Sequence, residues 1–290
     1  MIEVLYSFMW GMMSNYYFNR IATVRIGKSS QNGFIASGLR VEFSITKTTK
    51  SDSNKCQLTI YNLSKYYSSR ITVNDGMIVE LMTGYSDSIY LDLTFIGDVI
   101  SISYDESNPD KSITLELEDG GLLIRRHVMS LSLKAGSTLK DVFKTILSKQ
   151  IGNYQNNILD KIPNVTLKNG ISHAGYTSDF LNVLCKSYNL EWSIQNGILQ
   201  VTKLSEYVVN NPIEIRALQT PKRIYANRAK EEDDKNFNGY EIKCLLAAKA
   251  VPGGTIKIGN TKYKVMHVKH IGDTHGEDWE STITVKDILQ

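Results

Sequence analysis

The densest group of side chains that could do chemistry lies near the C-terminus, in the stretch HVKHIGDTHGEDWE, residues 267–280. Its imidazole and carboxylate groups belong to His267, His270, Asp273, His275, Glu277 and Asp278. Groups of these types ligate zinc or exchange protons in an active site. Three interpretations therefore compete: a metal site, a catalytic centre, and a polar connection between two strands.

A zinc site in this stretch would need its histidines on one face of one element. A zinc-binding helix carries two histidines four residues apart, with a glutamate after the first. His267 and His270 are three residues apart, in a run rich in β-branched residues that favours a strand. Side chains three apart on a strand point to opposite faces, so one ion could hardly contact both. We therefore expect no metal site and no cofactor.

The same stretch fits a hairpin connection better. Gly272 and Gly276 allow positive φ. Asp273 and Thr274 can form hydrogen bonds with the local backbone. Trp279 would then begin the return strand and fill the end of a hydrophobic core. The stretch is therefore predicted to be a tight connection that closes the last β segment.

The remaining candidate groups for catalysis are scattered. The sequence has no Gly-x-Ser-x-Gly elbow and no phosphate-binding loop. The carboxylates of Glu116, Glu118 and Asp119 are interpreted as the outer face of a strand end. A Ser-His-Asp arrangement stays open, because its members can come from anywhere in a chain. From these residues we predict no catalytic site, and we expect that the protein is not an enzyme.

The three cysteines, Cys56, Cys185 and Cys244, lie far apart in the sequence. An odd and scattered set argues against a disulfide framework and indicates folding in a reducing compartment. Without a Cys-x-x-Cys pair, a thiolate zinc site is not expected. Each cysteine is predicted to be a small buried hydrophobic residue.

The composition indicates a folded protein but selects no partner. Of 290 residues, 42% are hydrophobic and 22% are charged, and the net charge is +3. A nucleic-acid-binding protein usually concentrates basic residues on one face, which this balance does not require. The stretch PKRIYANRAK, residues 221–230, sets Tyr225 among basic side chains. An OB-type barrel that binds single-stranded nucleic acid therefore stays an alternative, although the 16 tyrosines also suit protein interfaces.

The order of elements is predicted to be β, then α/β, then β. Residues 20–118 alternate apolar and polar side chains, as in LRVEFSI at 39–45, which is typical of antiparallel strands in a sandwich or barrel. Residues 119–205 change to apolar residues at helical spacing and contain a hairpin pattern, which indicates a small mixed α/β domain. Strand patterns return over residues 206–290.

Local signals place the caps and the turn of the α/β domain. An N-cap is expected at Ser137 or Thr138 for the first helix, and at Thr177 or Ser178 for the second. The pair Asn196–Gly197 joins two alternating runs in EWSIQNGILQV. It predicts a β-hairpin with a type I′ turn, which needs positive φ at both central residues.

The first 18 residues, MIEVLYSFMWGMMSNYYF, are apolar and aromatic. They are short for a bilayer span, which takes about 20 apolar residues, and polar side chains interrupt them. They also lack the basic start and the cleavage pattern of a signal peptide. Residues 1–19 are therefore predicted to be an arm that packs on a neighbouring subunit. A membrane anchor is the alternative, and it is not expected.

Two parts of the chain resemble the tail hub proteins of contractile-tailed phages. The first part, within residues 34–104, contains GLRVEFSITKTTKSDSNKCQLTIYNLSK, then DGMIVELMTGY and IGDVIS. Like the family, it has a strand ending in Lys-Thr, an Asn-led strand ending in IYNLS, and a later Gly-Asp. The second part, within residues 240–286, contains HVKHIGDTHGEDWESTI, with the Gly-Asp-Thr-His-Gly loop before a tryptophan.

The resemblance implies a fold of two tube-like β-barrel domains, residues 20–118 and 206–290, which flank the α/β domain at 119–205. It also implies a structural role in the virion, as a homotrimeric ring in the tail baseplate, assembled in the host cytoplasm. Such a ring joins the sixfold tail tube to the threefold spike. The implied partners are tube, spike, baseplate wedge and tape measure proteins, with DNA only in transit through the channel. A cell-wall-degrading tail hydrolase stays an alternative.

Overall fold

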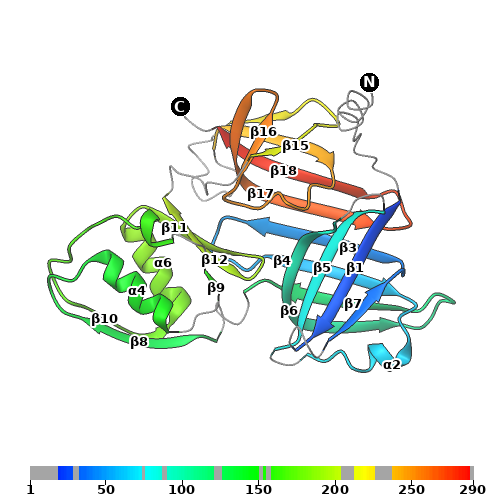
Figure 1. Ribbon diagram of the computed structural model, residues 1–290, viewed down its shortest axis with the longest axis horizontal. Helices are drawn as coiled ribbons and strands as arrows, with labels where there is room; N and C mark the ends of the chain where they lie inside the picture. Colours follow the sequence, from blue (N-terminus) through cyan, green and yellow to red (C-terminus); the bar gives the residue numbers. More distant parts are fainter. Residues whose placement is uncertain are drawn as a thin grey trace, which may run out of the picture.

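The computed structural model describes residues 19–28, 33–73, 76–86, 90–120, 126–149, 153–154, 158–203, 212–225 and 237–287. The arm predicted for residues 1–19 lies outside this part, apart from Asn19. The chain is mainly β, as the alternation predicted, and in the sequence a smaller α/β segment separates two β segments that lie next to each other in space (Figure 1). Among the described residues, no helix has the length and apolar character that crossing a bilayer requires.

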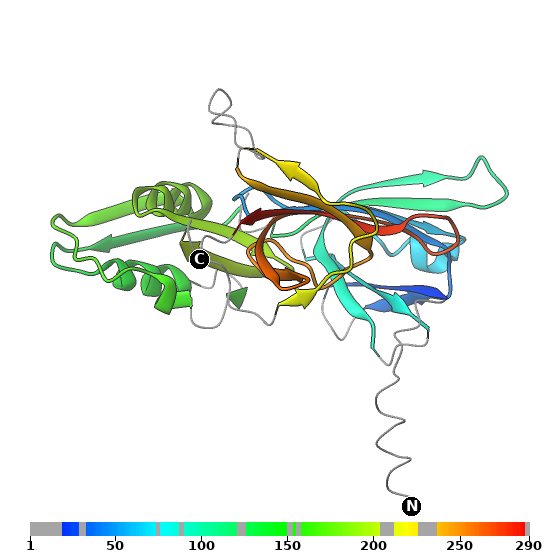
Figure 2. The same ribbon diagram turned by 90° about the horizontal axis from the view of Figure 1, so that it is seen from above.

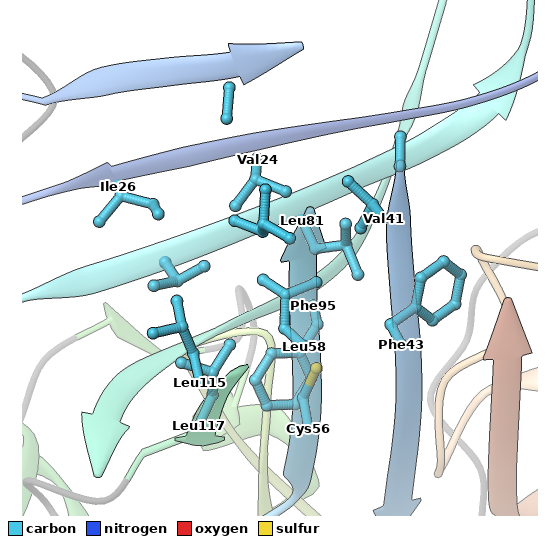
Figure 3. Packing of buried hydrophobic residues seen from close by; sticks show 14 of the residues in the cluster. Val24, Ile26, Val41, Phe43, Cys56, Leu58, Leu81, Phe95, Leu115 and Leu117 are labelled. Atoms are coloured by element: carbon cyan, nitrogen blue, oxygen red, sulfur yellow. The ribbon is translucent and has the colours of Figure 1, made fainter. Parts of the chain in front are cut away.

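The N-terminal β segment contains antiparallel strands and a short helix. Its elements are β1 (Arg20–Gly27), β2 (Phe34–Ser37), β3 (Val41–Thr48), β4 (Lys55–Tyr61), α2 (Lys65–Ser68), β5 (Ile78–Tyr85), β6 (Asp92–Asp105) and β7 (Ser112–Glu118). In β3, Val41, Phe43 and Ile45 are buried and the residues between them are not, which confirms the alternation predicted there. With Leu58 and Phe95 they form part of one hydrophobic core (Figure 3).

The C-terminal β segment is built in the same manner. Its strands are β13 (Ile213–Glu214), β14 (Lys222–Ile224), β15 (Gly239–Leu245), β16 (Thr255–Ile258), β17 (Thr261–Asp273) and β18 (Trp279–Asp287). Buried Ile242, Val265, Ile283 and Val285 belong to a second hydrophobic core, separate from the first. Each β segment therefore has a hydrophobic core of its own.

The two β segments share one sheet. β3 pairs antiparallel with β17, which sets Ile45 opposite His270 and Phe43 opposite Gly272. The strand order is β14-β15-β18-β17-β3-β4-β7-β6-β5-β1-β2, with β16 beside β17 and β13 beside β16. Among the described residues this sheet is open, with β14 and β2 at its ends, whereas the resemblance implied two separate barrels.

Trp279 fixes the join between the two segments. It begins β18, as predicted, but its side chain is buried in the core of the N-terminal segment. Its ring lies 5.6 Å from the ring of Phe43 and 6.3 Å from that of Tyr85, measured between centroids. A Cβ at Gly272 would lie 2.2 Å from the Phe43 ring, so only glycine lets β17 approach β3 this closely.

The α/β segment lies beside the large sheet in both views (Figures 1 and 2). Its elements are β8 (Val128–Leu133), α4 (Leu139–Ser148), β9 (Asn153–Tyr154), α5 (Ile158–Lys161), β10 (Ile171–Tyr176), α6 (Thr177–Ser187), β11 (Leu190–Gln195) and β12 (Ile198–Lys203). Side chains from both small sheets and from α4 and α6 form a third core, separate from those of the β segments.

The local predictions in this segment are partly confirmed. Thr138 is the N-cap of α4, and its hydroxyl accepts a hydrogen bond from the Asp141 N–H in a capping box. The cap expected at Thr177 or Ser178 is wrong, because strand β10 runs directly into α6 and Tyr176 holds the cap position with an extended backbone. The three cysteines are buried, as predicted.

Candidate functional site

Two joints hold the segments of the chain together, and they contain several of the polar residues singled out in the sequence. The clamp is the connection between β17 and β18 with the residues that hold it: Arg20, Arg40, Val41 and residues 273–278. The latch is the tip of the β11–β12 hairpin with its surroundings: Lys47, Asn54, Thr94, Asp119, Gln195, Asn196 and Gly197.

Asp273 is the centre of the clamp. Its Oδ2 accepts a hydrogen bond from Arg40 Nη2 at 2.9 Å, and its Oδ1 accepts one from the His275 backbone N–H at 2.9 Å. Burial would raise the pKa of Asp273, but the hydrogen bonds from Arg40 and from the loop backbone outweigh burial and hold the pKa below its ordinary value. A charged carboxylate thus connects β17 to the start of β3.

Two further contacts press the loop onto the N-terminal segment. Arg20 Nη1 donates to the carbonyl of Gly276 at 2.7 Å, and the backbone N–H of Val41 donates to Thr274 Oγ1 at 3.0 Å. A Cβ at Gly276 would lie 2.2 Å from an Asp273 carboxylate oxygen, so glycine is required there. The predicted hairpin connection is confirmed, and it also contacts the other β segment. The positive φ expected at Gly272 and Gly276 is wrong, because both glycines serve close approaches of side chains and not a left-handed turn.

The three histidines of the opening stretch do not converge. His267 and His270 lie on opposite faces of β17, as predicted, and only His270 is buried. His275 lies on the exposed loop, with Nδ1 3.0 Å from Thr274 Oγ1. Within the part of the chain that the structure describes, no three His, Cys, Asp or Glu side chains come together to hold a metal ion.

A serine and a histidine do meet, in the C-terminal segment. Ser281 Oγ lies 2.7 Å from His270 Nδ1, a distance at which histidine can act as a base toward serine. Both side chains are 0% exposed, so a substrate could not reach either of them. Burial, and to a smaller extent the charge of Lys47, lower the pKa of His270 to about 3. The pair is therefore a neutral core contact that connects β17 to β18.

The latch begins at the turn of the β11–β12 hairpin. Asn196 and Gly197 have φ values of 52° and 77°, which confirms the predicted turn with two left-handed residues. Their backbone N–H groups donate to the two carboxylate oxygens of Asp119, at 2.6 Å and 2.7 Å. One carboxylate at the end of β7 thus binds the whole tip of a hairpin that belongs to the α/β segment.

Lys47 approaches the same tip from β3. Its ammonium group donates to the Asn196 side-chain oxygen and to the Thr94 carbonyl, both at 2.6 Å. Lys47 is 0% exposed, and burial lowers its pKa to about 8, although the charge of Asp119 opposes that shift. A buried lysine is tolerated only where hydrogen bonds and an opposite charge compensate for lost hydration, and the latch supplies both.

Side-chain amides complete the latch. Asn54 Nδ2 donates to the Ile194 carbonyl at 2.7 Å and to Gln195 Oε1 at 3.1 Å. Gln195 Nε2 donates in turn to the Thr48 carbonyl at 2.7 Å. These contacts run from the β3–β4 region of the N-terminal segment to the hairpin strand β11. The hairpin tip is therefore held by polar contacts from several elements.

Asp119 corrects an earlier interpretation. The sequence placed it on the outer face of a strand end, but it is 1% exposed and it faces the hairpin tip. Burial raises its pKa, although the hydrogen bonds and Lys47 oppose that rise. At the next position, Gly120 has a φ of +68°, and a Cβ there would lie 2.3 Å from Ile194. The β11–β12 hairpin thus explains both the burial of Asp119 and the need for a glycine at position 120.

A third contact connects the α/β segment to the C-terminal β segment. The ammonium group of Lys264 on β17 forms a buried ion pair with Glu191 on β11. Thr202 Oγ1 on β12 also donates to Glu191 Oε1, at 3.1 Å. The α/β segment is thus fixed to both β segments, and these links are polar, since its hydrophobic core is separate from theirs.

The motifs that carry the hub resemblance build these joints. Lys47, Thr48 and Asn54, from the Lys-Thr pair and the Asn-led strand, contact the hairpin tip. The Gly-Asp-Thr-His-Gly loop, residues 272–276, is the core of the clamp. The motifs therefore hold the segments of the chain together, and the Ser281–His270 contact within them is fully buried.

The basic stretch PKRIYANRAK is only partly described. Arg223 Nη2 donates to Asp287 Oδ2 at 2.8 Å, and its guanidinium lies 4.5 Å from the ring centroid of Tyr240. Tyr225 is 75% exposed. Residues 226–230 lie outside the described part of the chain. Arg223 contacts Asp287 and Tyr240 within the fold, so its guanidinium does not favour a site for single-stranded nucleic acid.

A hollow of about 360 Å³ is lined by residues of β3, β4, β6 and β7. Its lining residues are Ser44, Thr46, Lys55, Cys56, Gln57, Ile100, Glu116, Leu117 and Glu118. Lys55 lies opposite Glu118 across β4 and β7, so opposite charges face each other there. This mixture gives the hollow no single charge that would select a ligand.

Comparison by sequence finds no relative: no family model matches, and no curated protein matches. Comparison by structure finds tail proteins. The 43 kDa tail protein of prophage MuSo2 from Shewanella oneidensis has a TM-score of 0.61 at 10% identity, over 92% of this chain and 98% of that chain. The tail protein from Neisseria meningitidis MC58 has a TM-score of 0.58 at 12% identity, over 93% and 97%.

A third similar structure belongs to a secretion machine. It is an E. coli component of the type VI secretion system, described as structurally similar to the T4 bacteriophage tail proteins gp27 and gp5. Its TM-score is 0.60 at 10% identity, over 92% of this chain and 77% of that chain. At these identities the likeness concerns the fold, and at that level it confirms the resemblance noted in the sequence.

Proposed function

We propose that this chain is a structural hub of a phage tail baseplate, which acts in the virion after assembly in the host cytoplasm. The observation that carries the proposal is the fold, which the chain shares over more than nine-tenths of its length with two tail proteins, one of them from a prophage. The similarity to a protein described as resembling T4 gp27 and gp5 agrees with a position at the end of the tail.

In the proposed assembly, three copies form a ring. Each copy supplies two tube-like β domains, residues 20–118 and 206–290, with the α/β domain 119–205 beside them. The ring then offers six related units to a sixfold tail tube and three equivalent positions to a threefold spike. The shared sheet, the clamp and the latch support this role, because an adapter between two rings must hold its units in one fixed orientation.

The work of such a hub is binding. Its partners would be the tube, spike, wedge and tape measure proteins, while DNA would pass through the channel only in transit. Strand edges and loops, which form most of the surface of a β protein, are the groups that carry such contacts. The burial of the Ser281–His270 pair agrees with a role that breaks no bonds, since no substrate could reach it.

The proposal is tested by measuring mass in solution with light scattering, for the full chain with and without the tube and spike proteins of the same tail. One chain has a mass of 32.7 kDa. With the partners present, we expect complexes that contain three copies of this chain. A chain that stays a single copy under both conditions would contradict the proposal.

A further inference from the structure

Helix α2 presents a cluster of aromatic side chains to the solvent. We call it the α2 patch, and it consists of Phe34, Tyr66, Tyr67, Arg70 and Tyr104. The ring centroids of Phe34 and Tyr67 lie 4.8 Å apart, and those of Tyr66 and Tyr67 lie 5.1 Å apart. The rings therefore form one continuous surface.

Arg70 and Tyr104 extend this surface. The Arg70 guanidinium lies 5.6 Å from the centroid of Tyr66 and 5.9 Å from that of Phe34. The Tyr104 hydroxyl donates to the Ser68 carbonyl at 3.2 Å, which brings β6 against α2. The patch thus joins a strand edge, a helix and the β6–β7 hairpin.

The tyrosine side chains of the patch are large and exposed to solvent. Tyr66 is 68% exposed and Tyr104 is 54% exposed, and α2 buries none of its own residues. A helix of four residues has little stability of its own, and α2 has no buried side chain that would add to it. Contiguous exposed aromatic side chains mark surfaces that bind something.

The patch also borders a sheet edge. Phe34 belongs to β2, which ends the large sheet, and β1 is its pairing partner among the described residues. An edge strand carries backbone groups that proteins commonly cover with another segment. An occupant of the patch would therefore cover both the rings and the edge of β2.

We propose that the α2 patch binds residues 1–18 of the same chain, in place of the neighbouring subunit that we expected from the sequence as the partner of this segment. This segment carries aromatic and apolar side chains of the kind that the patch would contact, such as Phe8 and Trp10. Its one charged side chain is Glu3, and the patch region carries Lys65 and Arg70, so the charges are complementary. Covering the patch would remove apolar surface of both parts from water.

The segment is long enough to reach. It ends next to Asn19, where β1 begins, and the pairing of β1 with β2 sets Ile26 opposite Phe34. The distance from Arg20 to Ile26 along β1 is about 20 Å, at about 3.3 Å per residue. Eighteen residues can span up to about 60 Å when extended. The occupant and its site therefore lie within reach inside one chain.

The test is disulfide formation in the full-length chain. The variant pair Ser7→Cys with Tyr66→Cys places one thiol in the segment and one in the patch. The matched control is Ser7→Cys with Val183→Cys, because Val183 is also an exposed apolar residue, at 67%, but lies on α6. The three natural cysteines are buried and do not compete. Disulfides are followed by peptide mass spectrometry after mild oxidation of dilute protein.

We expect the patch pair to form its disulfide at least about tenfold faster than the control pair, in a product of single-chain mass, because docking raises the effective concentration. Equal rates for both pairs would overturn the proposal. A product of double mass would assign the patch to the segment of a neighbouring copy instead, and would overturn the same-chain form.

A second measurement tests the proposal without cysteine variants, which could misfold. Nitration of Tyr66 is measured in the full chain and in a Phe8→Ser, Trp10→Ser variant, with Tyr225 as the internal reference. Tyr225 is 75% exposed and lies on the C-terminal β segment. We expect nitration of Tyr66 to rise several-fold in the variant while that of Tyr225 stays constant. An unchanged ratio of the two would overturn the proposal.

Discussion

The carboxylate of Asp119 accepts a hydrogen bond of 2.7 Å from the backbone N–H of Gly197, which lies 78 residues away in the sequence. One oxygen pair at the end of a strand thereby holds a hairpin tip of a segment with a separate hydrophobic core. Segments joined by polar contacts move against each other by default, unless the contacts fix them. The latch therefore links the α/β segment to the N-terminal β segment through direct hydrogen bonds at the hairpin tip.

The first prediction concerns this carboxylate. Asp119→Asn removes the negative charge that faces buried Lys47, and we expect the free energy of unfolding to fall by about 3 kcal/mol. The matched control is Asp52→Asn, in an exposed turn of the same segment, where the change should stay within about 0.5 kcal/mol. Urea unfolding measures both. Equal effects of the two substitutions would mean that the latch contributes nothing to stability.

The second prediction concerns pH. Burial lowers the pKa of His270 to about 3, whereas an unfolded chain protonates this ring near 6.5. Between pH 6.5 and pH 3, His270 is therefore protonated in the unfolded state but neutral in the folded state. The stability that neutral His270 contributes is complete above pH 6.5 and is lost as the pH falls toward 3. The loss should amount to about 1.4 kcal/mol per pH unit.

The measurement is urea unfolding at several pH values between 6 and 4. In His270→Gln, we expect a slope of stability against pH that is shallower than that of the natural chain by about 1.4 kcal/mol per unit. His275→Gln, on the exposed clamp loop, should leave the slope unchanged. Parallel slopes for all three proteins would show that His270 is not buried as described.

The third prediction concerns the seam between β3 and β17. Gly272→Ala would place a methyl group 2.2 Å from the Phe43 ring, so we expect a loss of about 1–3 kcal/mol from overpacking. Phe43→Leu in the same chain should recover part of that loss, because the smaller side chain leaves room. A double-mutant cycle on thermal unfolding measures this coupling. Additive effects would contradict the close approach of the two strands.

The fourth prediction concerns metal. Because the three histidines of residues 267–280 do not converge, His275→Ala should leave the bound metal content of the purified protein unchanged. Elemental analysis of the natural chain and the variant provides the comparison. Stoichiometric zinc in the natural chain that disappears in the variant would establish the metal site that the geometry argues against.

Local features of the fold could be predicted from the sequence. The alternation in β3, the capping box at Thr138 and the Asn196–Gly197 turn each depend on residues within a few positions of one another. The cap of α6 was missed although it is local, because a strand that leads straight into a helix leaves no separate capping residue. Short-range signals thus fix most elements and their faces.

Contacts between distant residues could not be predicted in the same way. The burial of Asp119 depends on a hairpin tip that is 77 residues away, and an acidic residue at a strand end gives no sign of such a partner. The pairing of β3 with β17 likewise joins Ile45 to His270, and alternation alone does not say which strands pair. The two barrels were expected as separate units, whereas the described strands of the two β segments share one sheet.

The central claim is that three copies of this chain form the adapter ring of a tail. Single-particle electron microscopy of the chain assembled with its tube and spike proteins tests it most directly, because it counts copies and locates them in one measurement. We predict a ring with three copies around one axis, each placing two β units against the tube. A single copy, or a ring whose β units do not contact the tube, would contradict the account.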